Sequence, residues 1–185
     1  MPFAGFPEQA LVSYEGLLAD NTKTYWSDHR AVYDGCVARP LRALLDDLGP
    51  EFGEAKVLRP SRDVRFSRDK TPYKTKAAAV VQEGSDVGQG LYLALSADGL
   101  EVGGGFHHTG PGQVQRLQPK PWDAGHPRAD LLRLKTLTAV RRFEPEDWLH
   151  TPEALHRVAA GWRRLEPLLG WLREHLGPSR VAVRR

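Results

Sequence analysis

The amino-acid sequence predicts an α+β domain, in which an antiparallel sheet at about residues 55–105 is flanked by N-terminal and C-terminal helices. Apolar residues recur at helical spacing near the N-terminus, alternate at strand spacing in the centre, and return to helical spacing near the C-terminus. The 185 residues are 41% hydrophobic and 26% charged, which is typical of one globular domain. We therefore expect a single domain at residues 1–178 and a flexible basic tail at residues 179–185.

The N-terminal part predicts two helical segments. The first is expected over residues 8–20, and the Asp20-Asn21 pair that follows is suited to cap the second. The second apolar stripe passes Pro40, where we expect a kink or the junction of two helices, and Gly49-Pro50 is expected to end it. The apolar face of the first segment holds Leu11, Tyr14 and Leu18, and the second stripe holds Trp26, His29, Tyr33, Val37, Leu41, Leu44, Leu45 and Leu48.

The centre of the chain predicts an antiparallel meander, because apolar residues alternate there and turn residues separate the alternating runs. Residues 69–72 and Asp98-Gly99 are expected to form turns, and residues 84–90 a glycine-rich loop. Gly103-Gly104-Gly105 is expected to end the meander, before a loop rich in Gly and Pro that extends to about residue 125. Strands are expected at Val57 and over residues 64–66, 75–82, 91–95, 100–102 and 136–143.

The C-terminal part predicts a long amphipathic helix. Thr151 is a suitable N-cap, Pro152 suits the first helical position, and Gly177-Pro178 is expected to end the helix. Because Pro167 removes one backbone donor, we expect this helix to pack on its own domain rather than in a long coiled coil. Its apolar stripe holds Leu155, Val158, Trp162, Leu165, Leu169, Leu172 and Leu176.

Positive charge is concentrated in residues 59–76, called the basic strip below. The strip holds seven basic residues and two aspartates, whereas the whole chain has a formal charge of only +3. Arginine guanidinium groups offer paired donors that match phosphate or carboxylate oxygens. We expect Val64 and Phe66 to face the core, with the intervening Arg65 on the opposite side. The predicted anion ligands are Arg59, Arg62, Arg65, Lys70 and Lys74, and the candidate groups for proton transfer are Asp63 and Asp69.

The basic strip also carries a family resemblance. Together with Gly5-Phe6-Pro7 and the series Asn21, Trp26, His29, Tyr33 and Pro40, it resembles the domain-of-unknown-function 2461 family, most specifically over residues 62–74. The resemblance continues through Gly103-Gly104-Gly105 and residues 126–135, and so covers most of the chain. It implies a single soluble α+β domain of bacteria and some eukaryotes, without an established activity. It also implies a shortened segment between Phe106 and Arg116, where similar chains carry a longer, largely helical one.

Three functions fit these features. We favour binding of a phosphorylated or otherwise anionic ligand through the basic strip, either as a binding protein or as an enzyme. The second is a protein-interaction module that docks through the helix of residues 155–176, with the strip serving as a structural ion-pair network. The third is non-specific nucleic-acid binding, for which Phe66 and Tyr73 lie beside the charges.

The sequence indicates neither a cofactor nor a metal. Cys36 is the single cysteine, and the adjacent His107-His108 pair points in two directions on any regular backbone. The glycine run at residues 103–105 matches neither a dinucleotide fingerprint nor a phosphate loop. No apolar run has the length of a membrane span, and residues 1–7 do not resemble a secretion signal, so we expect a cytoplasmic protein without a membrane partner.

Overall fold

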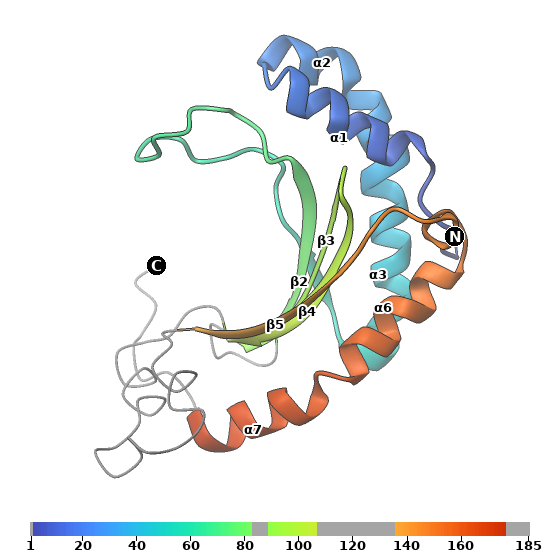
Figure 1. Cartoon of the computed structure of the whole chain (residues 1–185), viewed down its shortest axis with the longest axis vertical. Helices are drawn as coiled ribbons and strands as arrows, with labels where there is room; N and C mark the ends of the chain where they lie inside the picture. Colours follow the sequence, from blue (N-terminus) through green and yellow to red (C-terminus); the bar gives the residue numbers. More distant parts are fainter. Residues whose placement is uncertain (1, 83–88, 107–135, 177–185) are drawn as a thin grey trace.

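The computed structural model describes residues 2–82, 89–106 and 136–176, and it confirms the α+β class (Figure 1). Within those residues, five strands form one antiparallel sheet whose order β1-β2-β3-β4-β5 follows the sequence. The strands are β1 (Ala55–Val57), β2 (Lys76–Gln82), β3 (Gln89–Ser96), β4 (Gly99–Phe106) and β5 (Leu137–Phe143). The helices are α1 (Gln9–Ala19), α2 (Lys23–Val32), α3 (Arg39–Phe52), α6 (Glu153–Arg163) and α7 (Glu166–Leu176), with a π-helix η1 (Tyr33–Ala38) and a 3-10 helix η3 (Asp147–His150).

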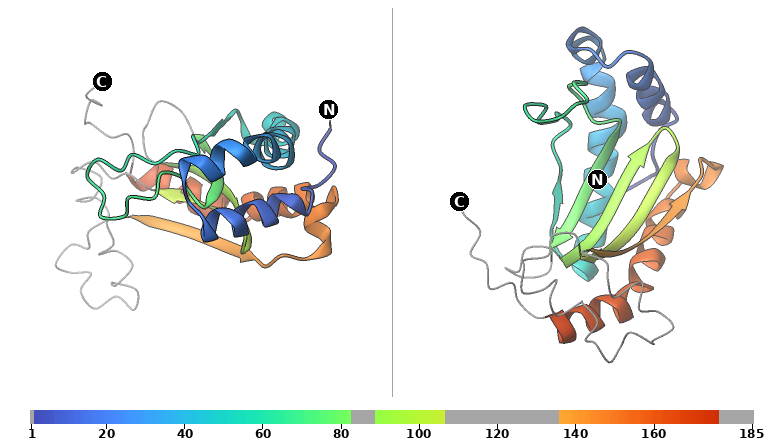
Figure 2. Two further views of the ribbon diagram at one scale, coloured as in Figure 1. Left: turned by 90° about the horizontal axis from the view of Figure 1, so that it is seen from above. Right: turned by 60° about the vertical axis from the view of Figure 1, so that its left-hand side comes forward.

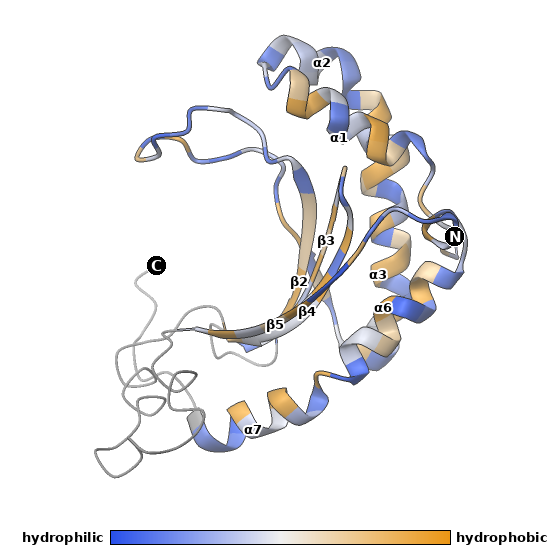
Figure 3. Cartoon of the chain, in the orientation of Figure 1, coloured by the Kyte–Doolittle hydropathy of each residue, from blue (hydrophilic) through white to orange (hydrophobic). Residues whose placement is uncertain are grey.

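The sheet is curved, and helices α3, α6 and α7 lie along its convex side (Figures 1 and 3). Alternate residues of β3 enter the core between the sheet and these helices, as Leu91, Leu93 and Leu95 do. Trp162 of α6 is 1% exposed, packs edge-on against Phe52 with ring centroids 5.2 Å apart, and donates its indole N–H to the carbonyl of Tyr92 at 3.1 Å. The opposite, concave side of the sheet carries the polar residues described below.

The predicted kink near Pro40 takes the form of the π-helix η1, which joins α2 to α3. Proline cannot donate a hydrogen bond to the preceding turn, so the helical bonding rearranges before it. The second apolar stripe survives this change, and all but one of its members are buried. The buried members are Trp26, Tyr33, Val37, Leu41, Leu44, Leu45 and Leu48, whereas His29 is exposed.

Two predicted helix boundaries in the N-terminal part are wrong. The cap of α2 is Thr22, whose hydroxyl accepts the N–H of Tyr25 at 3.2 Å, and not the Asp20-Asn21 pair. Helix α3 continues through Gly49-Pro50 and ends at Gly53, whose φ of 93° suits a glycine terminator. Proline is tolerated in this last turn because it removes only one hydrogen bond there, while Phe52 remains packed on Trp162.

Three further local predictions need correction. Residues 64–66 form a turn in a segment outside the sheet, because two alternating apolar residues are too few to establish a buried strand face. Gly103-Gly104-Gly105 does not end the meander but lies within β4, hydrogen-bonded to β3 and β5. The predicted long C-terminal helix is two helices, α6 and α7, which lets both follow the curved sheet and places Pro167 in the first turn of α7.

Several predictions lie outside the described residues. They concern most of the loop at 84–90, the loop up to residue 125, the shortened segment between Phe106 and Arg116, His107-His108, and the tail at 179–185. In the part of the chain that is described, no helix has the length and apolarity needed to cross a membrane.

Candidate anion-binding site

The basic strip forms a long excursion between β1 and β2 (Figures 1 and 2). The outgoing and the returning part of this excursion meet at one β-bridge, where Ser61 lies opposite Tyr73. On either side of this bridge, the N–H of Arg62 donates to Pro72 and the N–H of Lys74 donates to Pro60, each at 2.8 Å. Beyond the bridge the chain projects away from both the sheet and the helices. The strip is therefore a hairpin-like arm that contributes little to the core.

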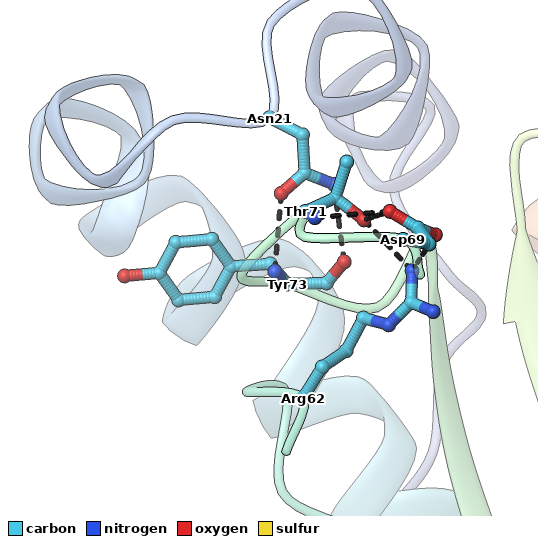
Figure 4. A network of polar contacts seen from close by, with 5 residues as sticks. All are labelled: Asn21, Arg62, Asp69, Thr71 and Tyr73. Carbon is cyan, nitrogen blue, oxygen red and sulfur yellow. Dashed lines mark hydrogen bonds and ion pairs between the residues drawn. The ribbon is translucent and has the colours of Figure 1, made fainter. Parts of the chain in front are cut away.

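The base of this arm is held by Asn21, in the connection between α1 and α2, and by Trp26 of α2. The Asn21 amide accepts the N–H of Tyr73 at 3.1 Å and donates to the carbonyl of the same residue at 3.0 Å (Figure 4). The Trp26 and Tyr73 rings stack with centroids 4.5 Å apart and planes 15° from parallel. Asn21, Trp26 and Tyr73 are among the residues that carried the family resemblance, and their contacts fix the position of the basic strip.

Inside the arm, Asp69 organises the turn. Its carboxylate pairs with Arg62, and it accepts the backbone N–H of Thr71 at 2.9 Å and the Thr71 hydroxyl at 2.7 Å (Figure 4). Arg62 also donates to the Thr71 hydroxyl at 2.7 Å. The hydrogen bonds from the Thr71 backbone and hydroxyl, together with that from Arg62, lower the pKa of Asp69 to about 2.

A second internal pair stands nearer the tip of the arm. The guanidinium of Arg65 donates to both carboxylate oxygens of Asp63, at 2.9 and 2.6 Å. This interaction lowers the pKa of Asp63 and raises that of Arg65. Carboxyl groups with lowered pKa remain ionised at neutral pH and accept protons poorly. Asp63 and Asp69 thus act here as partners of arginines, and their use in proton transfer stays a prediction.

The other cations of the arm are not neutralised in this way. Lys70 donates to the carbonyl of Val64 at 3.0 Å, and Lys74 donates to the carbonyl of Arg59 at 2.8 Å. Partial burial and the nearby guanidinium of Arg59 lower the pKa of Lys74, as expected where like charges gather. Among the residues that the structure describes, no carboxylate forms an ion pair with Arg59, Arg68, Lys70 or Lys74. The charge of Arg59 is the last and smallest of the causes that lower the pKa of Asp63.

We expect the Asp69 turn to loosen in acid. Because the folded-state pKa of about 2 lies below the ordinary value of 3.8, the stabilisation is complete above about pH 4 and is lost as the pH falls toward 2. The NMR shift of the Thr71 amide should titrate with a midpoint near pH 2, and Asp69→Asn should abolish that titration. A midpoint near pH 4 in the unmodified chain would contradict the pairing described above.

A polar cluster on the concave side of the sheet was not predicted. Glu101 of β4 accepts from Lys76 of β2 at 3.1 Å and from Arg142 of β5 at 2.9 Å, and the Lys76 ammonium lies 5.6 Å from the centre of the Tyr92 ring. The strand register brings these residues together although they lie far apart in the sequence. One available signal was Glu101 itself, a charged residue between Leu100 and Val102 that must face away from the core.

The described residues form two small cavities away from the basic strip. Their volumes are about 70 and 10 Å³, and they lie one beside Trp162 at the α3–α6 side and one between α1 and α2. Neither is lined by a residue of the basic strip. Within residues 2–82, 89–106 and 136–176, no group of three or more His, Cys, Asp or Glu side chains could hold a metal ion.

The protein is an α+β domain. It has a curved antiparallel meander, helices on the convex side of the sheet, and a basic arm held at its base by Asn21 and Trp26. The chain belongs to the DUF2461 family, described as a conserved hypothetical protein, whose family model matches residues 9–118 and 112–171. This confirms the resemblance that the basic strip predicted. No curated protein and no solved structure matches the chain.

Proposed function

We propose that the basic strip binds a phosphorylated or otherwise anionic ligand. The observation that carries this proposal is the set of cations without a carboxylate partner in the described part of the chain, namely Arg59, Arg68, Lys70 and Lys74. Asp63 and Asp69 are already occupied by Arg65 and Arg62. Like charges gathered on one arm repel one another, so an anion that bridges them would stabilise the folded state.

The anchoring of the arm supports binding rather than a purely structural role. Asn21 and Trp26 fix its base, and the Arg62–Asp69–Thr71 contacts stiffen its turn. Groups that are held in place lose less conformational entropy when they bind a ligand. A network of ion pairs that served only to neutralise charge would not leave four cations without a carboxylate partner. We propose no proton-transfer step, because the pKa of each carboxyl group is lowered by its hydrogen-bond partners.

Docking through the C-terminal stripe has less support. Val158, Trp162, Leu169 and Leu172 are buried within the domain itself, so the apolar residues that suggested a docking face already have partners. Trp171 of α7 is the large apolar side chain of this region that remains 38% exposed, and its ring stacks on His175 with centroids 4.7 Å apart. This exposure is ordinary for a single surface residue.

The test is a comparison of two charge-matched double variants. Arg59→Gln/Arg68→Gln removes two cations from the arm, and Arg39→Gln/Arg164→Gln removes two exposed arginines elsewhere, at the start of α3 and at the C-cap of α6. At low salt, inorganic phosphate, pyrophosphate, ATP and oligonucleotides are titrated against each protein. Each charge-assisted hydrogen bond is worth about 1.5–3 kcal/mol, so we expect at least a roughly tenfold loss of affinity for the first variant only. Equal losses in both variants, or no binding by the unmodified protein, would contradict the proposal.

A further inference from the structure

The outer end of the basic strip displays one aromatic side chain almost completely to solvent. Phe66 is 96% exposed, whereas the other exposed large apolar residues of the described chain range from 37% to 59%. The prediction that Phe66 faces the core is therefore wrong. Figure 3 shows the projecting arm as mainly hydrophilic, with a short hydrophobic stretch near its outer end. Core packing does not account for a phenylalanine in this place.

The turn that carries Phe66 is held by contacts on both sides. Arg65 is paired with Asp63, and its guanidinium lies 5.9 Å from the Phe66 ring centre. The N–H of Ser67 and the ammonium of Lys70 both reach the carbonyl of Val64, at 3.4 and 3.0 Å. An aromatic ring on a stiffened turn offers a flat apolar face without a large ordering cost on binding.

The unpaired cations of the arm lie on both sides of Phe66 in the sequence. Arg68 and Lys70 follow Phe66 toward β2, and Arg59 and Lys74 lie at the base of the arm, where the Lys74 ammonium reaches the Arg59 carbonyl. The arm therefore combines one exposed ring at its tip with cations near the tip and at its base. A small phosphate ion would use the cations and leave the ring without a partner. A strand of nucleic acid supplies both spaced phosphates and the π-faces of bases.

We propose, on the basis of the proposed function, that the anionic ligand is a single-stranded nucleic acid. Phosphates contact Arg59, Arg68, Lys70 and Lys74, and an unpaired base stacks on Phe66. A single strand is favoured over a duplex because insertion of a side chain between paired bases requires unstacking, whereas the bases of a single strand are accessible. The reason for expecting nucleic acid is thus the aromatic ring, and the reason for expecting an anion is the charge.

An anionic membrane surface is the competing partner, and the arm suits it less well. A single myristoyl chain gives only marginal membrane binding, and one phenylalanine ring has less apolar surface than such a chain. The tip offers one phenylalanine, and two ionised carboxylates, Asp63 and Asp69, stand in the same arm.

The experiment measures the anisotropy of a labelled single-stranded oligonucleotide of about 12 nucleotides, a length that small single-strand-binding domains cover. Phe66→Ala is expected to weaken binding by roughly 5- to 100-fold, which corresponds to the loss of one stacked base. Phe66→Trp should restore the affinity, and Val12→Ala, which alters another exposed apolar side chain, should leave it unchanged. Binding of inorganic polyphosphate, which has no bases, should be the same for Phe66→Ala and the unmodified protein.

The outcomes separate this inference from the proposed function. If Phe66→Ala binds the oligonucleotide as tightly as the unmodified protein while Arg59→Gln/Arg68→Gln does not, the base-stacking inference is wrong and anion binding stands. If neither the oligonucleotide nor polyphosphate binds, both are wrong. Tighter binding to duplex than to single strands, or to phosphatidylserine vesicles with no oligonucleotide binding, also overturns the inference. Because Phe66 is 96% exposed, Phe66→Ala should not change the melting temperature, so loss of folding is not an alternative explanation.

Discussion

Replacing Asn21 with alanine is expected to release the basic strip and to abolish most of its anion binding. One amide group satisfies both the N–H and the C=O of Tyr73, 52 residues away, and alanine would leave both groups unpaired beside the Trp26 ring. Unsatisfied part-buried groups of this kind cost roughly 1–3 kcal/mol each, so we expect a loss of about 2 kcal/mol or more in the free energy of unfolding. The measurements are chemical denaturation, hydrogen exchange of the Tyr73 amide, and affinity for pyrophosphate.

Two further substitutions sharpen this test. Asn21→Asp keeps an acceptor for the Tyr73 N–H but replaces the donor that the Tyr73 carbonyl requires, and it should therefore fail to restore either stability or binding. Thr24→Ala changes an exposed residue of α2 and should behave as the unmodified protein. If the Tyr73 amide of Asn21→Ala remained protected from hydrogen exchange, the Asn21 hydrogen bonds would not be needed to hold the strip.

Gly5→Ala is expected to produce the largest loss of stability among single substitutions in the N-terminal segment. Gly5 has φ of 114°, which L-residues rarely adopt, and an added Cβ would collide with backbone atoms of His150 and Thr151. The same junction is held by the Phe6 N–H bonded to the carbonyl of Leu149 at 3.0 Å and by His150 Nδ1 donating to the carbonyl of Phe6 at 2.7 Å.

Strain and displacement act together at this position. Phe6 is fully buried, so moving the N-terminal segment to admit a methyl group would also disturb the core. We expect a loss of about 3 kcal/mol or more, which lowers the melting temperature by roughly 6–12 °C for a chain of this size. The matched control is Gly35→Ala, in the π-helix η1 with open space around it, which should be neutral or stabilising by up to about 1 kcal/mol. Equal melting temperatures for both variants would contradict the expectation.

Local pattern predicted the elements that bury one face. Leu91, Leu93 and Leu95 recur at every second position of β3 and are all buried, and the stripe from Trp26 to Leu48 keeps its helical spacing through the π-helix. Such periods extend over many residues and report burial directly. The pattern failed where it was short or interrupted. Two apolar residues at 64 and 66 did not make a strand, and a regular stripe did not keep α6 and α7 in one helix.

The composition of the candidate site was visible in the sequence, because the charge excess of the basic strip is a local property. Its internal pairing was not visible. Spacing alone does not tell that Asp69 pairs with Arg62 while Lys70 turns to a backbone carbonyl, since each choice depends on how the turn folds. The exposure of Phe66 is likewise a result of the arm projecting from the sheet.

The sequence by itself therefore determined the α+β class, the helices and strands whose apolar pattern extends over many residues, the family, and the place where positive charge gathers. The tertiary structure alone decided which of those charges are neutralised, which residues clamp the arm, and that Lys76, Glu101 and Arg142 meet on the concave side of the sheet. The physical reason is the range of the interactions. Burial periodicity and charge density are read from neighbouring residues, whereas hydrogen bonds and ion pairs between distant segments exist only after the chain has brought those segments together.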